Sequence, residues 1–303
     1  MQSMQKLLVV IDPTVEKDFV VERAMMLAKI TNAKINFFIN NNALSRHNFN
    51  YEGISTEFFE TQRTLFEKQH EKLLINLVAQ FTEAGLEASA DLASGNSLAE
   101  AVIQRVSESR PDLVLKSTHH HSLIERTLIT NTDWRLIRKC PVPLMLVKPN
   151  QWKISGSVVT AIDPMHTKSE QSTLDELLLT LTGQIAHFLN LKPHLFHSYF
   201  PFASSLFPMG GESAEYLSRI RLQHQEKLKL VTSKHAFKEE NIHLCQGELI
   251  PTLIEYLAKS EANLVVMGSL SRSSIERAII GYTAEKILER CPCDILVVKT
   301  PKA

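Results

Sequence analysis

The sequence predicts an α/β protein of two tandem, doubly wound domains, each a five-stranded parallel sheet with helices on both faces. Segments recur at a constant spacing, short apolar runs alternate with longer amphipathic ones, and 303 residues suffice for two domains of ordinary size. We expect domains over residues 1–150 and 151–303, joined without a Pro/Gly/Ser-rich linker.

Three pairs of segments repeat with an offset of 151 residues. The run at residues 7–13 (LLVVIDP) returns at 158–164 as VVTAIDP, residues 124–126 (IER) return at 275–277, and Cys140-Pro141 returns as Cys291-Pro292. A constant offset over this span indicates one unit duplicated head to tail.

Apolar runs and a 3.6-residue period predict the elements of each half. In the first half, the expected strands cover residues 7–11, 34–39, 87–92, 112–115 and 144–148, and the expected helices cover 16–30, 58–83, 98–107 and 133–138. In the second half, the expected strands lie near 157–162, 193–198, 241–245, 263–267 and 294–298, and the expected helices near 169–190, 213–236, 250–259 and 283–290. This alternation favours a parallel sheet with right-handed crossovers.

Composition excludes several classes of partner. Lys plus Arg and Asp plus Glu both number 33, so the chain lacks the net positive charge typical of nucleic-acid binding. No apolar run has membrane-spanning length, and the first residues do not resemble a signal peptide, so we expect no membrane insertion and a cytoplasmic location. The four cysteines form no CxxC pair; Cys140 and Cys291 are repeat equivalents, which favours a packing role.

In doubly wound sheets, ligands bind beyond the carboxyl ends of the strands where the winding reverses. Asp163 follows the first strand of the second half and Gly268 ends the fourth; Gly281 then precedes a helix. Glycines at these places can expose backbone amides to a phosphate. Ser269, Ser271 and Thr283 add hydroxyl groups. The alternative is that the glycines are ordinary turns, Thr283 is an N-cap and Asp163 is a turn residue.

The segments Val265-Val266-Met267-Gly268, Gly281-Tyr282-Thr283-Ala284-Glu285 and Cys291 to Val298 resemble the universal stress protein family. The tandem length and residues 132–134 (TDW) are similar to its E subgroup. The resemblance implies an adenine nucleotide alpha hydrolase-like fold with strand order 3-2-1-4-5, a role in stress survival, and binding of ATP with Mg²⁺. The halves would pack like a family dimer, and both a monomer and a homodimer remain open.

The sequence departs from the nucleotide-binding pattern of that family. In the second half, Ser271 stands where the second glycine belongs and Tyr282 replaces a small hydroxyl residue. In the first half, all three glycines are lost, because Ser117, His120 and Thr130 occupy their positions. We therefore expect the first half not to bind ATP in the family manner. The ligand-binding residues expected in the second half are Asp163, Gly268, Ser269, Ser271, Gly281, Tyr282 and Thr283.

Three function classes remain open. The first is a binding module for a nucleotide or another anionic ligand in the second half. The second is a weak ATPase at that site, although no nucleophile motif and no metal-ligand set is recognisable. The third is an interaction scaffold. The apolar segment 199–211 indicates either a self-packed loop or a pocket wall for an amphiphile with an acyl chain, and His119-His120-His121 indicates a polar loop rather than a metal site.

Overall fold

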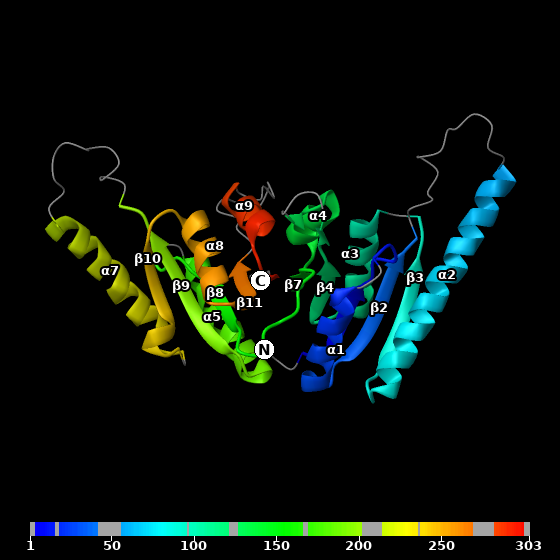
Figure 1. Cartoon of the computed structure of the whole chain (residues 1–303), viewed down its shortest axis with the longest axis horizontal. Coiled ribbons are helices and arrows are strands. Elements are labelled where there is room, and N and C mark those ends of the chain that lie inside the picture. Colours follow the sequence, from blue (N-terminus) through cyan, green and yellow to red (C-terminus); the bar gives the residue numbers. More distant parts are fainter. Residues whose placement is uncertain are drawn as a thin grey trace. The chain divides into compact units, whose positions relative to one another are not determined.

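The computed structural model describes residues 4–15, 18–41, 56–95, 97–120, 127–165, 169–201, 214–235, 237–268 and 282–299. The strands of the first half are β1 (Lys6–Val10), β2 (Lys34–Asn40), β3 (Ala88–Ala93), β4 (Leu113–Ser117) and β7 (Leu144–Val147), with a small pair formed by β5 (His119–His120) and β6 (Thr127–Leu128). Its helices are α1 (Phe19–Thr31), α2 (Thr56–Glu83), α3 (Leu98–Ser109) and α4 (Asn131–Lys139). Figure 1 shows the strands of each half between helices.

The second half repeats this order. Its strands are β8 (Ser157–Ala161), β9 (Lys192–Tyr199), β10 (Ile242–Gln246), β11 (Ala262–Gly268) and β12 (Asp294–Val298). Its helices are α5 (Ser169–Leu189), α7 (Ala214–Thr232), the short 3₁₀ helix η1 (Glu239–Asn241), α8 (Leu249–Lys259) and α9 (Tyr282–Arg290).

Each half contains five parallel strands in the expected order. In the first half the order is β3-β2-β1-β4-β7, and in the second it is β10-β9-β8-β11-β12. The predicted fold class is therefore confirmed. The chain divides into two compact units that follow the two halves, except that His120 of β5 and the whole of β6 are grouped with the second. The boundary between residues 150 and 151 stays a prediction.

Side-chain alternation along β2 separates two layers around the sheet. Phe37 packs edge-on against Phe81 of α2, with ring centroids 4.9 Å apart. Asn36, which directly precedes Phe37 in the strand, accepts a hydrogen bond from Arg105 of α3. Consecutive strand residues point to opposite faces, so α2 and α3 cover opposite faces of this sheet.

Two element ends differ from the sequence prediction for identifiable reasons. The helix expected from residue 16 begins at Phe19, because Asp18 is its N-cap and accepts a hydrogen bond from Val20 N at 3.1 Å. The strand expected to end at residue 115 continues to Ser117, because the polar Lys116 is buried with a counter-charge. No helix in the described residues is long and apolar enough to span a bilayer.

Candidate functional site

The winding of the second sheet reverses between β8 and β11. The chain runs from β8 outward through β9 and β10, and then returns to place β11 on the other side of β8. Asp163 lies two residues after β8, and Gly268 is the last residue of β11. The structure therefore brings these two predicted site residues to the carboxyl edge of neighbouring strands, where ligands bind in such sheets.

Asp163 is exposed, and its carboxylate makes a local turn. Its Oδ1 accepts a hydrogen bond from Met165 N at 3.2 Å. The equivalent Asp12 accepts hydrogen bonds from Thr14 N at 3.0 Å and Thr14 Oγ1 at 2.6 Å. The turn interpretation is confirmed for both residues. A turn carboxylate that is also exposed remains available to a hydrogen-bond donor.

Gly268 has a packing reason to be glycine. A β-carbon at this position would lie 2.5 Å from Leu174 Cδ2 of α5, which is far inside van der Waals contact. The glycine therefore lets α5 approach the end of β11 closely. Any exposure of its amide to a ligand is an additional property of the position.

Two acidic side chains of α5 lie on the Asp163 side of this edge. Burial, together with the neighbouring charges of Asp163 and Glu176, raises the pKa of Asp175 from 3.8 to about 7. Asp175 therefore takes up a proton near neutral pH. This side of the edge is acidic and is unsuited to a bare phosphate.

Close to Asp163, His197 of β9 and His224 of α7 are joined by a hydrogen bond. His197 Nδ1 lies 3.0 Å from Ile162 O, and His197 Nε2 lies 2.8 Å from His224 Nδ1. Because a carbonyl only accepts, Nδ1 of His197 carries its proton, and Nε2 accepts from His224. Burial lowers the pKa of both imidazoles, which agrees with two neutral rings. Tyr199 stacks on His224 with centroids 5.0 Å apart.

The corresponding edge of the first half is occupied by its own side chains. Lys116 Nζ lies 2.8 Å from Asp133 Oδ1, and both side chains are buried. Thr130 caps α4: its Oγ1 accepts from Asp133 N at 3.2 Å, while Asp133 Oδ2 accepts from Thr130 N at 2.8 Å. The helix N-terminus that would face a phosphate is thus satisfied internally.

A second internal contact closes the same edge. Ser117 Oγ donates a hydrogen bond to Asp18 Oδ1. Burial raises the pKa of Asp18, and the hydrogen bonds from Ser117 and Val20 oppose that shift. Side chains of the first half therefore occupy the edge that corresponds to the β8–β11 edge of the second half.

The remaining predicted residues are only partly described. Ser269, Ser271 and Gly281 lie outside the described residues, as do His121 and residues 202–213. Tyr282 and Thr283 are the first two residues of α9. The N-cap interpretation of Thr283 is therefore wrong, because an N-cap residue precedes the first helical residue. In the first half the N-cap residue is Thr130, which corresponds to Gly281 of the second half.

Sequence reasoning missed Asp18, Lys116, Asp133, Asp175 and the His197–His224 pair. A lysine inside an apolar strand, with an aspartate 17 residues later at a helix start, was a usable signal for the Lys116–Asp133 pair. The two histidines are 27 residues apart in different elements, and nothing local in the sequence connects them.

Comparison with known proteins identifies the family. The model of the universal stress protein family matches residues 4–148 and 161–299. Universal stress protein E of Escherichia coli K12 is 31% identical over 309 aligned residues, covering 99% of this chain and 95% of the relative. The homologue from Haemophilus influenzae is 26% identical over 314 residues and covers 99% of both chains.

Solved structures show the same fold over the whole chain. A protein of unknown function from Pseudomonas aeruginosa PAO1 superposes with a TM-score of 0.76 at 21% identity, covering 99% of this chain and 94% of the other. A universal stress protein from Archaeoglobus fulgidus superposes with a TM-score of 0.69 at 15% identity, covering 99% of both.

Proposed function

The chain belongs to the universal stress protein family, and we propose that its second half binds a nucleotide, or another anionic small ligand, at the β8–β11 edge. The observation that carries this proposal is the position of Asp163 and Gly268 at the carboxyl ends of the two strands where the winding reverses. The chain acts in stress survival as a ligand-binding protein of the cytoplasm rather than as a robust enzyme.

The two sides of the edge have different roles. Backbone amides and hydroxyls around α9 hold the phosphates, since a helix N-terminus carries unpaired N–H groups and partial positive charge. The proposed phosphate-side residues are Gly268, Ser269, Ser271, Gly281, Tyr282 and Thr283. Asp163 lies on the opposite side and accepts hydrogen bonds from the base or the sugar.

The acidic side of the edge supports this orientation. The exposed carboxylate of Asp163 repels a phosphate there, and it attracts hydrogen-bond donors such as an exocyclic amine or ribose hydroxyls. The first half lacks such a division, because its phosphate side is filled by Lys116, Asp133 and Thr130.

Isothermal titration calorimetry of the purified protein with ATP and Mg²⁺ tests the proposal. Gly281→Val abolishes binding, because a branched side chain directly before α9 crowds the phosphates that the helix N-terminus would hold. Thr130→Val, at the equivalent position of the first half, leaves binding unchanged and lowers the stability of that half by about 1 kcal/mol through loss of the α4 cap. Equal loss of binding from both variants contradicts the asymmetry between the halves.

The same preparation separates the rival functions. Release of phosphate from ATP, lost in Gly281→Val, indicates a weak ATPase at this site. Stabilisation by an acyl-bearing lipid alone assigns the site to an amphiphile held by the 199–211 segment, of which Tyr199 and Pro201 are buried and Phe200 is half exposed. Native mass spectrometry of the same sample distinguishes a monomeric pseudo-dimer from a homodimer. Absence of any ligand effect supports the scaffold.

A further inference from the structure

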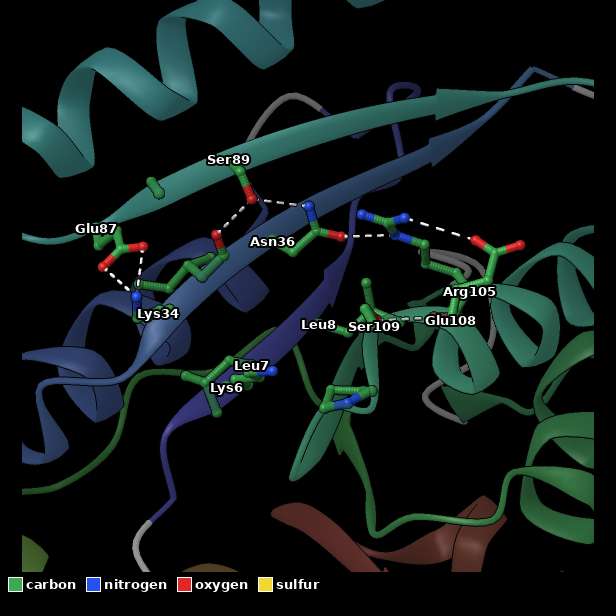
Figure 2. Close-up of a pocket in the computed structure, with 13 residues that line it drawn as sticks. Lys6, Leu7, Leu8, Lys34, Asn36, Glu87, Ser89, Arg105, Glu108 and Ser109 are labelled. Carbon is green, nitrogen blue, oxygen red and sulfur yellow. Dashed lines mark hydrogen bonds and ion pairs between the residues drawn. The ribbon is translucent and has the colours of Figure 1, made fainter.

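The first half contains a cavity at the opposite edge of its sheet, away from the site discussed so far. It has a volume of about 390 Å³ and lies at the amino ends of β1, β2 and β3, facing α3 (Figure 2). A volume of this size is typical of sites for small molecules. The side chains that matter for its chemistry are Lys6, Leu8, Lys34, Asn36, Ser89 and Arg105.

Strand register places these side chains in two rows. Lys6 pairs with Lys34, and Leu8 pairs with Asn36, across β1 and β2. Asn36 in turn pairs with Ser89 of β3. Residues two apart on a strand share a face, so two lysines lie side by side at the rim and a polar row lies deeper.

The polar wall of the cavity is fixed by its own hydrogen bonds. Arg105 Nε donates to Asn36 Oδ1 at 3.2 Å, and Arg105 also pairs with Asp91. Asn36 Nδ2 donates to Ser89 Oγ at 3.0 Å and to Asp91 Oδ2 at 2.7 Å. Figure 2 shows Asn36 between Ser89 and Arg105. These hydrogen bonds fix the side chains of the wall in one arrangement and keep them from filling the cavity.

The rim carries three cations, Lys6, Lys34 and Arg105, and the described carboxylates beside it form ion pairs with only two of them. Glu87 pairs with Lys34 at 2.8 Å, and Glu108 lies 3.6 Å from Arg105. Asp112 accepts the backbone amide of Lys6 at 2.9 Å. Within the described ranges, no carboxylate forms an ion pair with the Lys6 ammonium group, which is exposed beside Lys34.

We propose that this cavity binds a small polar molecule through its carboxylate or phosphate group. The anionic group lies between Lys6 and Lys34, where it forms the ion pair that the Lys6 ammonium group lacks among the described residues. The rest of the molecule lies along the polar wall and donates hydrogen bonds to Ser89 Oγ and Asn36 Oδ1, whose neighbouring hydrogens are already committed. This site is separate from the nucleotide site proposed above, and its occupancy does not depend on that proposal.

In the second half, aromatic and imidazole side chains occupy the region that corresponds to this cavity. The equivalents of Lys6, Asn36 and Arg105 are Ser157, His194 and Tyr256. Ser157 is buried and donates to Ser260 O at 3.1 Å, so the cation is missing. Tyr256 Oη lies 2.6 Å from His194 Nδ1, and the rings of His194, His243 and Tyr256 pack with centroids 4.6–6.2 Å apart. Ring packing has replaced the open polar wall.

The test titrates the full chain with inorganic phosphate and with citrate against sodium chloride at matched ionic strength, using ¹H–¹⁵N amide shifts. We expect saturable shifts at Lys6, Lys34 and Ser89 with at least one of the two anions. Response to phosphate alone assigns a phosphate ligand, and response to citrate alone assigns a carboxylate. Absence of saturable shifts at these amides with both anions overturns the proposal.

Three variants locate the site. Lys6→Gln weakens binding roughly tenfold, as expected for loss of one charged hydrogen bond. Ser89→Phe abolishes it by filling the cavity, and a native amide spectrum for each variant shows that the fold is kept. Lys192→Gln, at the second-half equivalent of Lys34, leaves it unchanged. Unchanged affinity in Lys6→Gln, or an equal loss in Lys192→Gln, overturns the assignment.

Discussion

The two halves share one backbone plan and differ in the polar groups buried within it. Where the first half has the ion pair Lys116–Asp133, the equivalent positions of the second half hold Met267 and Ala284. Where the first half has the charged group Asn36, Asp91 and Arg105, the second has the neutral rings of His194, His243 and Tyr256. The fold therefore does not require either chemistry at these places.

The apolar strands explain why both solutions are tolerated. Each half buries the central residues of β1 and β4, or of β8 and β11, almost completely, and this burial supplies most of the driving force for folding. Buried polar groups beside such a core need only find hydrogen-bond or ion-pair partners. The halves could thus diverge at the edges of their sheets, where ligands bind, without losing the sheet.

The largest expected effect comes from breaking the first-half ion pair. Lys116→Met, which installs the second-half residue, lowers the free energy of unfolding of the first half by about 3–5 kcal/mol, because Asp133 is left buried without its counter-charge. Denaturant unfolding reports this through Trp134, which lies on α4, in a Trp152→Phe background.

The double variant is the matched control. Lys116→Met with Asp133→Ala reproduces both second-half residues and recovers most of the loss, leaving a deficit of about 1 kcal/mol from the lost α4 cap. If the single variant is no less stable than the double, the pair does not act as a coupled buried charge.

The same pair illustrates what the sequence could and could not predict. Apolar periodicity predicted every strand of the two five-stranded sheets, because burial dictates the pattern residue by residue, but it did not predict the short β5–β6 pair. Asp163 and Gly268 were predictable because strand ends in this topology meet at one edge. Lys116–Asp133, His197–His224 and the cavity wall depend on side chains from distant elements, and no local period encodes such contacts.

A smaller effect of opposite sign is expected at Asp175 of the second half. Its folded-state pKa of about 7 exceeds the unfolded value of 3.8, so stability is lost as the pH rises from about 4 to 7 and the buried carboxyl ionises. Asp175→Asn cannot ionise and is more stable than the wild type by about 2 kcal/mol above pH 7, allowing for partial solvent screening. Urea unfolding at several pH values should show this advantage growing between pH 4 and 7; an advantage that is independent of pH contradicts the assignment.

Protonation of His194 should destabilise the second half in acid and oppose the gain that protonated Asp175 gives over the same pH range. Burial lowers the pKa of His194 to about 4, so the unfolded chain binds more protons below pH 6.5, and stability is lost as the pH falls from 6.5 towards 4. His243, Lys192 and Lys259 face the same cluster and oppose its protonation. We expect His194→Asn, which installs the first-half residue, to remove about 1–2 kcal/mol of this acid sensitivity after allowance for its half-exposed ring.

Emission from Trp152 in a Trp134→Phe background follows the second half in this experiment, since Trp152 Nε1 bonds to Asp294 Oδ2 at 2.7 Å. The same acid titration on Asn36→His provides the reciprocal exchange. An acid sensitivity that His194→Asn leaves intact would assign it to His197 and His224 instead.

The smallest expected effect is at the strand ends that distinguish the two ligand edges. Gly268→Ser introduces the serine that the first half has at the equivalent position, Ser117. It lowers second-half stability by about 1 kcal/mol, because the new β-carbon would lie 2.5 Å from Leu174 Cδ2 and the leucine must move. In a Leu174→Ala background, the same change should cost little, since the space is already open. A double-mutant cycle by urea unfolding measures this coupling. Equal costs in both backgrounds would mean that the packing of α5 is not what restricts position 268 to glycine.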